Sequence, residues 1–177
     1  MISDQRFASS RPDVLVYQTG SLEEDITIAG PIIAHLHVST TGTDADWIVK
    51  LIDVFPDDAE GNLGGCQMLL AGDVFRSKYR KSLENPEAMI PNKIAEIDFN
   101  LFDKFHTFKK GHRIMIQIQS TWFPVIDRNP QTFCDIYKAD EKDFKKEFHR
   151  VHHSKTDLSY IKFINALGCL EMSGVSR

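Results

Sequence analysis

The sequence has little cysteine and no long apolar run. Three cysteines (Cys66, Cys134 and Cys169) lie far apart among 177 residues, and an odd number at such spacing does not predict a disulfide framework. No apolar stretch approaches the roughly 20 residues that cross a bilayer. The first seven residues lack the apolar segment of a signal peptide. We therefore expect no membrane partner, while the localisation stays open.

An excess of positive charge is also absent. The chain has 21 Lys and Arg residues against 25 Asp and Glu residues, which gives a formal net charge of -4. The one local basic run, residues 78–81, is short and more typical of a solvated edge than of a phosphate groove. The charge pattern therefore predicts no nucleic-acid partner.

Motifs for catalysis are missing as well. The Gly-x-Ser-x-Gly elbow that exposes a nucleophilic serine does not occur, and neither does a phosphate loop or a dinucleotide glycine fingerprint. No cysteine has the context of a recognised nucleophile. By itself, then, this chain is expected to hold no catalytic residue and no cofactor.

The chain does contain apolar residues with a period of two, which is the period of a β-strand. Apolar or alternating runs occupy residues 14–17, 32–38, 68–74, 95–101 and 114–118. Residues 47–55 are the most hydrophobic run, and they are apolar on both faces, which predicts a central strand covered on both sides. Asp53, the only acid inside that run, then needs a partner.

Helix signals are few. Residues 138–147 are the best candidate, with Phe144 and Phe148 on one face. Short strands joined by Gly, Pro and Asp turns, with at most one or two short helices, predict an all-β sandwich or barrel. A chain of 177 residues fits one domain, which we place at residues 1–167. Residues 168–177 lose the alternation and are expected to form a loose tail.

Two groups of histidines could supply metal ligands. His35 and His37 are two residues apart and so share one face of a strand. Two histidines on a solvent-facing surface are the commoner situation, and this is the favoured interpretation. His149, His152 and His153 form a weaker cluster without a carboxylate or cysteine at a fixed spacing.

Asp44 and Asp46 could supply oxygen ligands to calcium. A turn whose Asp side chains cap the backbone before the strand at 47–55 is the favoured alternative. The sequence therefore predicts no metal ion.

A loop with two aromatic residues, two prolines and an Asp-Arg pair spans residues 122–131, directly after the strand-like run 111–120. Trp122 and Phe123 could line a sugar or acyl pocket, or they could plug the end of the core. Asp127 and Arg128 could pair and fix the turn. The residues alone favour the structural role.

Several segments together resemble one protein family. They are residues 11–17, 28–32, 43–54 and 111–118, Trp122-Phe123-Pro124 with Asp127-Arg128-Asn129, and residues 149–151. Each segment is a weak motif, but their common order covers roughly residues 4–164. The chain thus resembles the C-terminal domain of the X-Pro dipeptidyl-peptidases. That domain is shared with cocaine esterase-like acyl esterases, α-amino-acid ester hydrolases and cephalosporin acylases.

The resemblance implies a jelly-roll β-sandwich of the galactose-binding-domain-like kind, in agreement with the strand pattern. In whole family members an α/β-hydrolase domain with a Ser-Asp-His triad precedes the jelly roll, so the implied partner is the catalytic domain of the same parent protein. The jelly roll packs over that domain and shapes the active-site entrance. Trp122, Phe123, Asp127 and Arg128 are on this basis candidates for the interdomain face.

The expected function is therefore that of a non-catalytic domain of a serine hydrolase that acts on X-Pro peptides or acyl esters. The resemblance does not choose between peptidase, esterase and acylase. The alternative is a free-standing carbohydrate-binding module, because the same fold class binds sugars through exposed aromatic residues. An isolated domain would expose its docking surface, so self-association is a further expectation.

Overall fold

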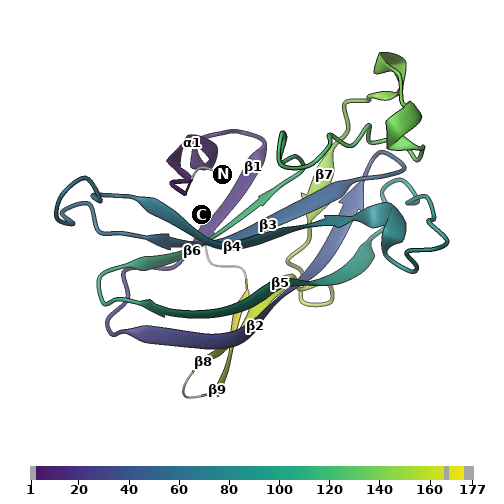
Figure 1. The fold of residues 1–177 in the computed structure, drawn as a ribbon. Helices are drawn as coiled ribbons and strands as arrows, with labels where there is room; N and C mark the ends of the chain where they lie inside the picture. The colour runs from purple at the N-terminus through teal and green to yellow at the C-terminus, as the bar shows by residue number, and fades with distance from the viewer. Residues whose placement is uncertain (1–2, 166–167, 174–177) are drawn as a thin grey trace.

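The fold is a β-sandwich of two antiparallel sheets (Figure 1). The computed structural model describes residues 3–165 and 168–173. Sheet A has the strand order β1-β6-β3-β4, and sheet B has the order β5-β2-β8-β9, with β7 paired to the end of β2. The strands are β1 (Val14–Gln18), β2 (Ile26–Thr40), β3 (Asp46–Val54), β4 (Gln67–Arg76), β5 (Ala95–Phe108), β6 (Arg113–Gln119), β7 (His149–Val151), β8 (Tyr160–Asn165) and β9 (Gly168–Ser173). The predicted all-β jelly-roll fold is confirmed.

Helix is scarce in the described part of the chain. It consists of α1 (Arg6–Ser9) and three single-turn 3₁₀ helices, η1 (Ser77–Tyr79), η2 (Ile136–Lys138) and η3 (Glu141–Asp143). No helix within these described ranges is long and apolar enough to cross a membrane.

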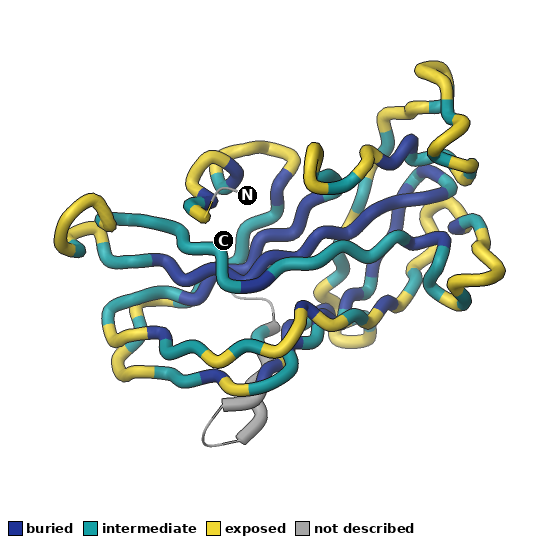
Figure 2. Tube along the Cα trace, in the orientation of Figure 1, coloured by how far each residue is buried: buried dark blue, intermediate teal, exposed yellow. Residues whose placement is uncertain are grey.

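The hydrophobic core lies between the two sheets. Ile32 and Leu36 of β2 point inward from sheet B and belong to one buried cluster with Val49 and Leu51 of β3 and Ile116 of β6. Figure 2 shows the buried positions along the strands of both sheets, with exposed residues mainly in the connections. Full burial of one such aliphatic side chain contributes about 1.5–3 kcal/mol relative to an exposed position. The alternating residues predicted to face inward on β2 do so.

Strand β3 is buried along its whole length and pairs with β4 on one side and β6 on the other. The prediction of a central strand covered on both faces is confirmed. Asp53 also has the partners it needs: its Oδ2 lies 2.9 Å from His106 Nε2, and its Oδ1 lies 2.8 Å from His112 Nδ1. These two imidazoles replace the water that the carboxylate loses on burial.

The outer face of sheet A is covered by the N-terminal segment. The Ser3 carbonyl accepts a 2.8 Å hydrogen bond from the Leu69 amide, and the Gln5 amide donates one of 2.8 Å to the Gln67 carbonyl, so this segment follows β4. Helix α1 then lies above the sheet, on the side away from sheet B (Figure 1). Lys50, on this outer face of β3, is consequently fully buried.

The helix predicted at residues 138–147 is wrong. The structure has η2 and η3 instead, and Ala139 between them is extended, with φ -72° and ψ 130°. A helix of ten residues is marginal without a packed face. Here the Asp143 carboxylate accepts a 2.9 Å bond from the Asp140 amide, so a local turn takes the place of helical hydrogen bonds.

The loose tail predicted from residue 168 is not what the structure shows for Gly168–Ser173. These residues form β9, which pairs antiparallel with β8 from Tyr160 opposite Ser173 to Asn165 opposite Gly168. Pairing at a sheet edge depends on backbone groups that almost any residue supplies, so loss of side-chain alternation did not exclude a strand. Residues 174–177 lie outside the described ranges.

Candidate docking surface

The longest connection between strands joins β6 to β7 and spans residues 120–148, here called the 120–148 loop. It lies at the right-hand end of the sandwich in Figure 1, together with the connection from β4 to β5, residues 77–94. Function in β-sandwiches is often carried by loops gathered at one end of a rigid scaffold. This end therefore holds the candidate site.

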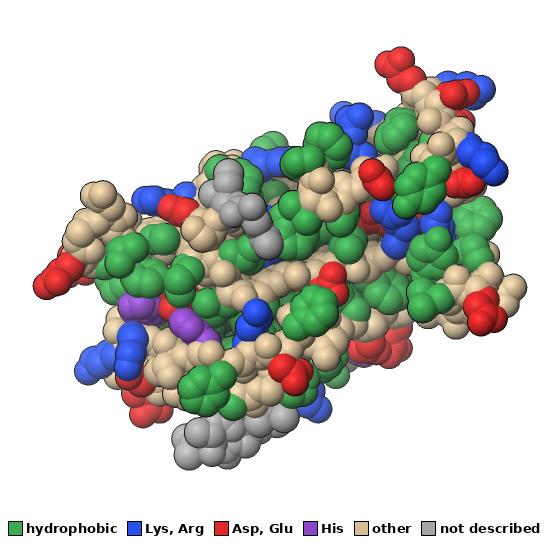
Figure 3. Space-filling view, viewed as in Figure 1, with side chains coloured by type: hydrophobic (Ala, Val, Ile, Leu, Met, Phe, Trp, Pro, Cys, Tyr) green, Lys and Arg blue, Asp and Glu red, His purple; other side chains and the backbone are tan. Residues whose placement is uncertain are grey.

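Large apolar side chains are exposed on this loop, and Figure 3 shows hydrophobic residues gathered at that end of the molecule. They are Phe123, Val125, Phe133, Tyr137, Phe144 and Phe148, to which the 77–94 connection adds Leu83 and Ile90. We call these eight residues the loop surface. Exposed apolar groups that cluster in this way are typical of an interaction site.

Arg128 lies between two aromatic rings of the loop surface. Its guanidinium carbon is 5.6 Å from the centroid of Phe123 and 5.5 Å from that of Phe144. A guanidinium over an aromatic face is attracted by the negative π-cloud, so Arg128 joins the two rings into one unit. Phe123, Asp127 and Arg128 are all exposed, as an interdomain contact requires.

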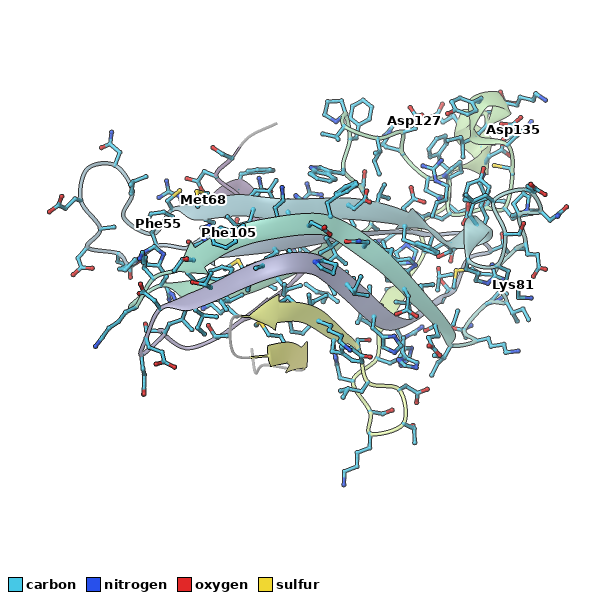
Figure 4. All side chains as sticks on the ribbon, turned by 60° about the horizontal axis from the view of Figure 1, so that its bottom comes forward. Phe55, Met68, Lys81, Phe105, Asp127 and Asp135 are labelled. Carbon is cyan, nitrogen blue, oxygen red and sulfur yellow. The ribbon has the colours of Figure 1, made fainter. Side chains whose placement is uncertain are left out.

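The predicted pairing of Asp127 with Arg128 is wrong. Among the described residues no ion pair joins them, and the carbonyl of Asp127 instead accepts a 3.4 Å bond from Arg76. Asp127 and Asp135 both project from the loops at the upper right of Figure 4, away from the sheets. The turn is held by other residues, which the sequence did not reveal as partners.

Those partners are Asn129, Asp44, Asp46 and Arg76, which form a largely buried network under the loop. The Asn129 amide donates to Asp44 Oδ2 at 3.1 Å and to Asp46 Oδ1 at 2.8 Å. Arg76 adds two parallel 2.9 Å bonds to the Asp46 carboxylate. Burial raises the pKa of Asp44, although the bond from Asn129 opposes that rise.

This network explains Asp44 and Asp46 without calcium. Besides the Asn129 bond, Asp44 Oδ1 accepts from the amides of Ala45 at 2.9 Å and Lys78 at 3.1 Å, as the capping interpretation predicts. Buried carboxylates need such donors. One sequence feature could have indicated the role of Asn129. It is an amide side chain next to Pro130, in a loop that returns to the acidic start of β3.

Trp122 begins the loop on the outer face of sheet A, half-buried over Lys50. The Lys50 ammonium is 5.0 Å from the Trp122 ring centroid and donates to Gln5 Oε1 at 2.8 Å and Gln119 Oε1 at 3.3 Å. Burial, with Arg11 nearby, lowers the pKa of Lys50 to about 8. Trp122 therefore positions the loop, whereas Phe123 presents itself to solvent.

A serine hydroxyl and a histidine ring are in contact in the described part of the chain, the pair that a hydrolase mechanism would need. Ser39 Oγ lies 2.9 Å from His152 Nε2, but Ser39 is buried, and no carboxylate among the described residues lies within 4.0 Å of a His152 ring nitrogen. A triad needs an accessible serine and an acid that orients the imidazole. The pair therefore does not form a catalytic triad within the described part of the chain.

The family described as the X-Pro dipeptidyl-peptidase C-terminal non-catalytic domain matches residues 3–162. The chain belongs to this family. This match confirms the resemblance to the X-Pro dipeptidyl-peptidase C-terminal domain family that the order of the motifs indicated.

Three relatives carry the comparison further. Cocaine esterase from Rhodococcus sp. (strain MB1 Bresler) is 33% identical over 159 residues, which are 90% of this chain and 26% of that protein. An aminopeptidase from a marine sediment Thaumarchaeota archaeon has 42% identity and a TM-score of 0.90, over 93% of this chain and 27% of that one. An α-amino acid ester hydrolase has 41% identity and a TM-score of 0.90 over the same shares. The chain thus spans about a quarter of the length of these relatives.

Proposed function

We propose that this chain is the non-catalytic jelly roll of a serine hydrolase that acts on X-Pro peptides or acyl esters. Its partner is the α/β-hydrolase domain of the same parent protein, which carries the Ser-Asp-His triad. Family membership and the quarter-length match to two hydrolases and an aminopeptidase support this proposal. Ser39 is buried, and no carboxylate of the described residues pairs with His152, which is consistent with a catalytic centre elsewhere.

The loop surface is proposed as the face that contacts the hydrolase domain. The observation that carries this assignment is the exposed Phe123–Arg128–Phe144 unit, because exposed aromatic and Arg side chains are the groups that dominate binding energy at protein interfaces. Asn129 and its buried acids hold the loop in one conformation before binding. A preorganised surface loses little conformational entropy on docking.

Each predicted interdomain residue then has its own part. Phe123 and Arg128 contact the hydrolase domain, and Asp127 lies at the polar rim of the contact. Trp122 stays packed over Lys50 and positions the loop. The docked loop forms one wall of the entrance to the active site.

The test is binding in trans. The chain is mixed with a separately produced hydrolase domain of the parent protein, or of the 41% identical α-amino acid ester hydrolase, and the affinity is measured by isothermal titration. Phe123→Ser with Val125→Ser is expected to weaken binding at least about tenfold, because truncated anchor residues cost about 2 kcal/mol or more.

The matched control is Phe105→Ser. Phe105 is another highly exposed phenylalanine, but it lies on β5 at the far end of the sandwich from Asp127 and Asp135 (Figure 4). It is expected to leave the affinity unchanged. Equal losses in both variants would remove the loop surface from the proposal, and binding of sugars without binding of the hydrolase domain would favour the carbohydrate-binding module.

Self-association through the same surface follows from the proposal. Sedimentation of the chain alone is expected to show concentration-dependent dimers that Phe123→Ser weakens and Phe105→Ser does not. Added hydrolase domain should dissociate these dimers, because both associations compete for one apolar surface.

A further inference from the structure

Two histidines and two carboxylates lie together on the outer face of sheet B. His35 and His37 come from β2, and Glu96 and Asp98 come from the neighbouring β5. The register places His35 directly opposite Asp98 and His37 directly opposite Glu96. Because side chains two residues apart share one face of a strand, all four project to the same side.

Three of the four residues already group their donor atoms: one ligand atom each from His35, Glu96 and Asp98 lie within 4.8 Å of one another, and His37 lies at the margin of this group. His35 Nδ1 is 2.7 Å from Asp98 Oδ1 and 3.9 Å from Glu96 Oε1, and His37 Nε2 is 4.0 Å from Glu96 Oε2. In a tetrahedral zinc site with bonds of about 2.0–2.2 Å, neighbouring ligand atoms are about 3.3–3.6 Å apart. Binding would replace the 2.7 Å hydrogen bond between His35 and Asp98, moving these two atoms apart, and would bring His37 Nε2 and Glu96 Oε2 closer than 4.0 Å.

The orientation of His37 is an independent observation that points to a ligand. Its Nδ1 lies 3.3 Å from the carbonyl oxygen of Leu158. A carbonyl can only accept, so Nδ1 is the donor in this contact, and Nε2 is the ring nitrogen that lies toward Glu96, 4.0 Å from its Oε2. Metal-binding histidines commonly donate their second ring N–H to a backbone carbonyl, which fixes the ring for coordination.

His35 is also held in place. Its ring stacks on Tyr160 of β8, with centroids 4.6 Å apart and planes at 26°. The two histidines are mostly covered, whereas the side chains of Glu96 and Asp98 are 59% and 56% exposed. An ion can therefore enter from solvent through the acids and reach ring nitrogens that are already oriented.

We propose that His35, His37, Glu96 and Asp98 bind one zinc ion. Two imidazoles and two carboxylates suit zinc, and the two acid charges balance a divalent cation. Four protein ligands complete the coordination sphere, so the ion is structural and joins β2 to the edge strand β5. The sequence alone favoured the interpretation that these histidines simply face solvent. That interpretation did not include Glu96 and Asp98, which the pairing of β2 with β5 brings next to them.

The test is titration of the metal-stripped 177-residue chain, without a polyhistidine tag, with zinc chloride by calorimetry. One zinc ion per chain is expected to bind with a Kd below about 10 µM. Calcium is expected not to bind, because it prefers oxygen ligands only. Cobalt(II) bound in place of zinc is expected to give the intense visible absorption of a tetrahedral site.

Variants assign the ion to the cluster. Glu96→Gln and His37→Gln are each expected to weaken zinc binding at least about tenfold. Glu96 is exposed, so its variant folds whatever the role of the site. Glu84→Gln, which changes an exposed acid outside the cluster, is the matched control and is expected to bind zinc as the parent chain does.

Thermal unfolding supplies a second readout. Zinc is expected to raise the Tm of the parent chain and of Glu84→Gln, but not that of Glu96→Gln, because only a ligand that binds the folded state stabilises it. Absence of stoichiometric zinc binding would overturn the proposal. So would binding that Glu96→Gln and His37→Gln leave unchanged, since the ion would then occupy another part of the chain.

Discussion

The Lys50 ammonium and the Trp122 ring are 5.0 Å apart, on the outer face of sheet A. This contact joins the central strand to the beginning of the 120–148 loop. Lys50 has no exposed surface, and its ammonium donates to the neutral side-chain amides of Gln5 and Gln119. The folded chain therefore holds a cation whose charged form is poorly solvated, and this should be visible in its stability.

Stability is expected to rise with pH between about 8 and 10.5. Burial, together with Arg11, lowers the pKa of Lys50 to about 8 in the folded state, against 10.5 for an ordinary lysine. Within this window the unfolded chain binds more protons than the folded chain, so deprotonation favours folding. The gain is at most about 3 kcal/mol. Urea unfolding across the pH range measures it.

Lys50→Met is the control, because methionine fills a similar volume without a charge. Other groups titrate in the same window, and the variant retains them. The difference between the two pH profiles is therefore expected to carry the Lys50 effect. Parallel profiles for the parent chain and Lys50→Met would contradict a lowered pKa at Lys50.

Asp46→Ala is expected to lower the free energy of unfolding by about 3–5 kcal/mol, because the half-buried Arg76 loses its carboxylate partner and the buried Asn129 loses one of its two acceptors. Urea denaturation measures the loss. Asp13→Ala removes the carboxylate of an exposed pair with Arg11, and such pairs contribute at most about 1 kcal/mol. A loss at Asp46 no larger than that at Asp13 would show that the network does not hold the loop.

Gly42→Ala is expected to destabilise the chain by about 1–3 kcal/mol through overpacking. A Cβ at this position would lie 2.5 Å from the carbonyl oxygen of Gln131 and 2.9 Å from Glu147 Cγ, so both arms of the 120–148 loop must move. Gly20→Ala meets no atom within 4 Å and serves as the control. Thermal melts are expected to give a lower Tm for Gly42→Ala than for Gly20→Ala. Equal Tm values would contradict the close packing of the 120–148 loop against Gly42.

Ser39→Ala is expected to leave ester hydrolysis unchanged. Ser39 is buried, and no acid within residues 3–165 and 168–173 orients its partner His152, so the parent chain should turn over p-nitrophenyl acetate no faster than a heat-denatured sample. The release of p-nitrophenol is followed by absorbance. Turnover by the folded chain that Ser39→Ala abolishes would make this chain an esterase by itself.

The strands were readable from sequence because a sheet with one buried face imposes an alternation that each short segment carries by itself. Ile32 to Val38 show this alternation and lie in β2, whereas the run at 47–55 was readable because it is apolar on both faces, and all of it but the last residue lies in β3. The helix predicted at 138–147 failed for the opposite reason. Its weak pattern had no packed face behind it, and local bonds between Asp140 and Asp143 stabilise turns in its place.

Partners of polar residues were less readable. The sequence showed that Asp53 required a partner, but His106 and His112 are 53 and 59 residues further along the chain. Arg128 was expected to bind its neighbour Asp127 and instead lies over Phe123 and Phe144. Sequence proximity was a poor guide here, because the closest contacts of a loop side chain are set by the surface on which it packs.

The amino-acid sequence by itself determined the fold class and the family, since strand periodicity and the order of short motifs are properties of a one-dimensional string. Tertiary structure alone decided which residues meet. Pairing of β2 with β5 brings Glu96 and Asp98 to His35 and His37, and the return of the 120–148 loop brings Asn129 to Asp44 and Asp46. Both sets of contacts join segments that are more than 50 residues apart in the sequence. They depend on how these segments align with one another, and no local sequence pattern encodes that alignment.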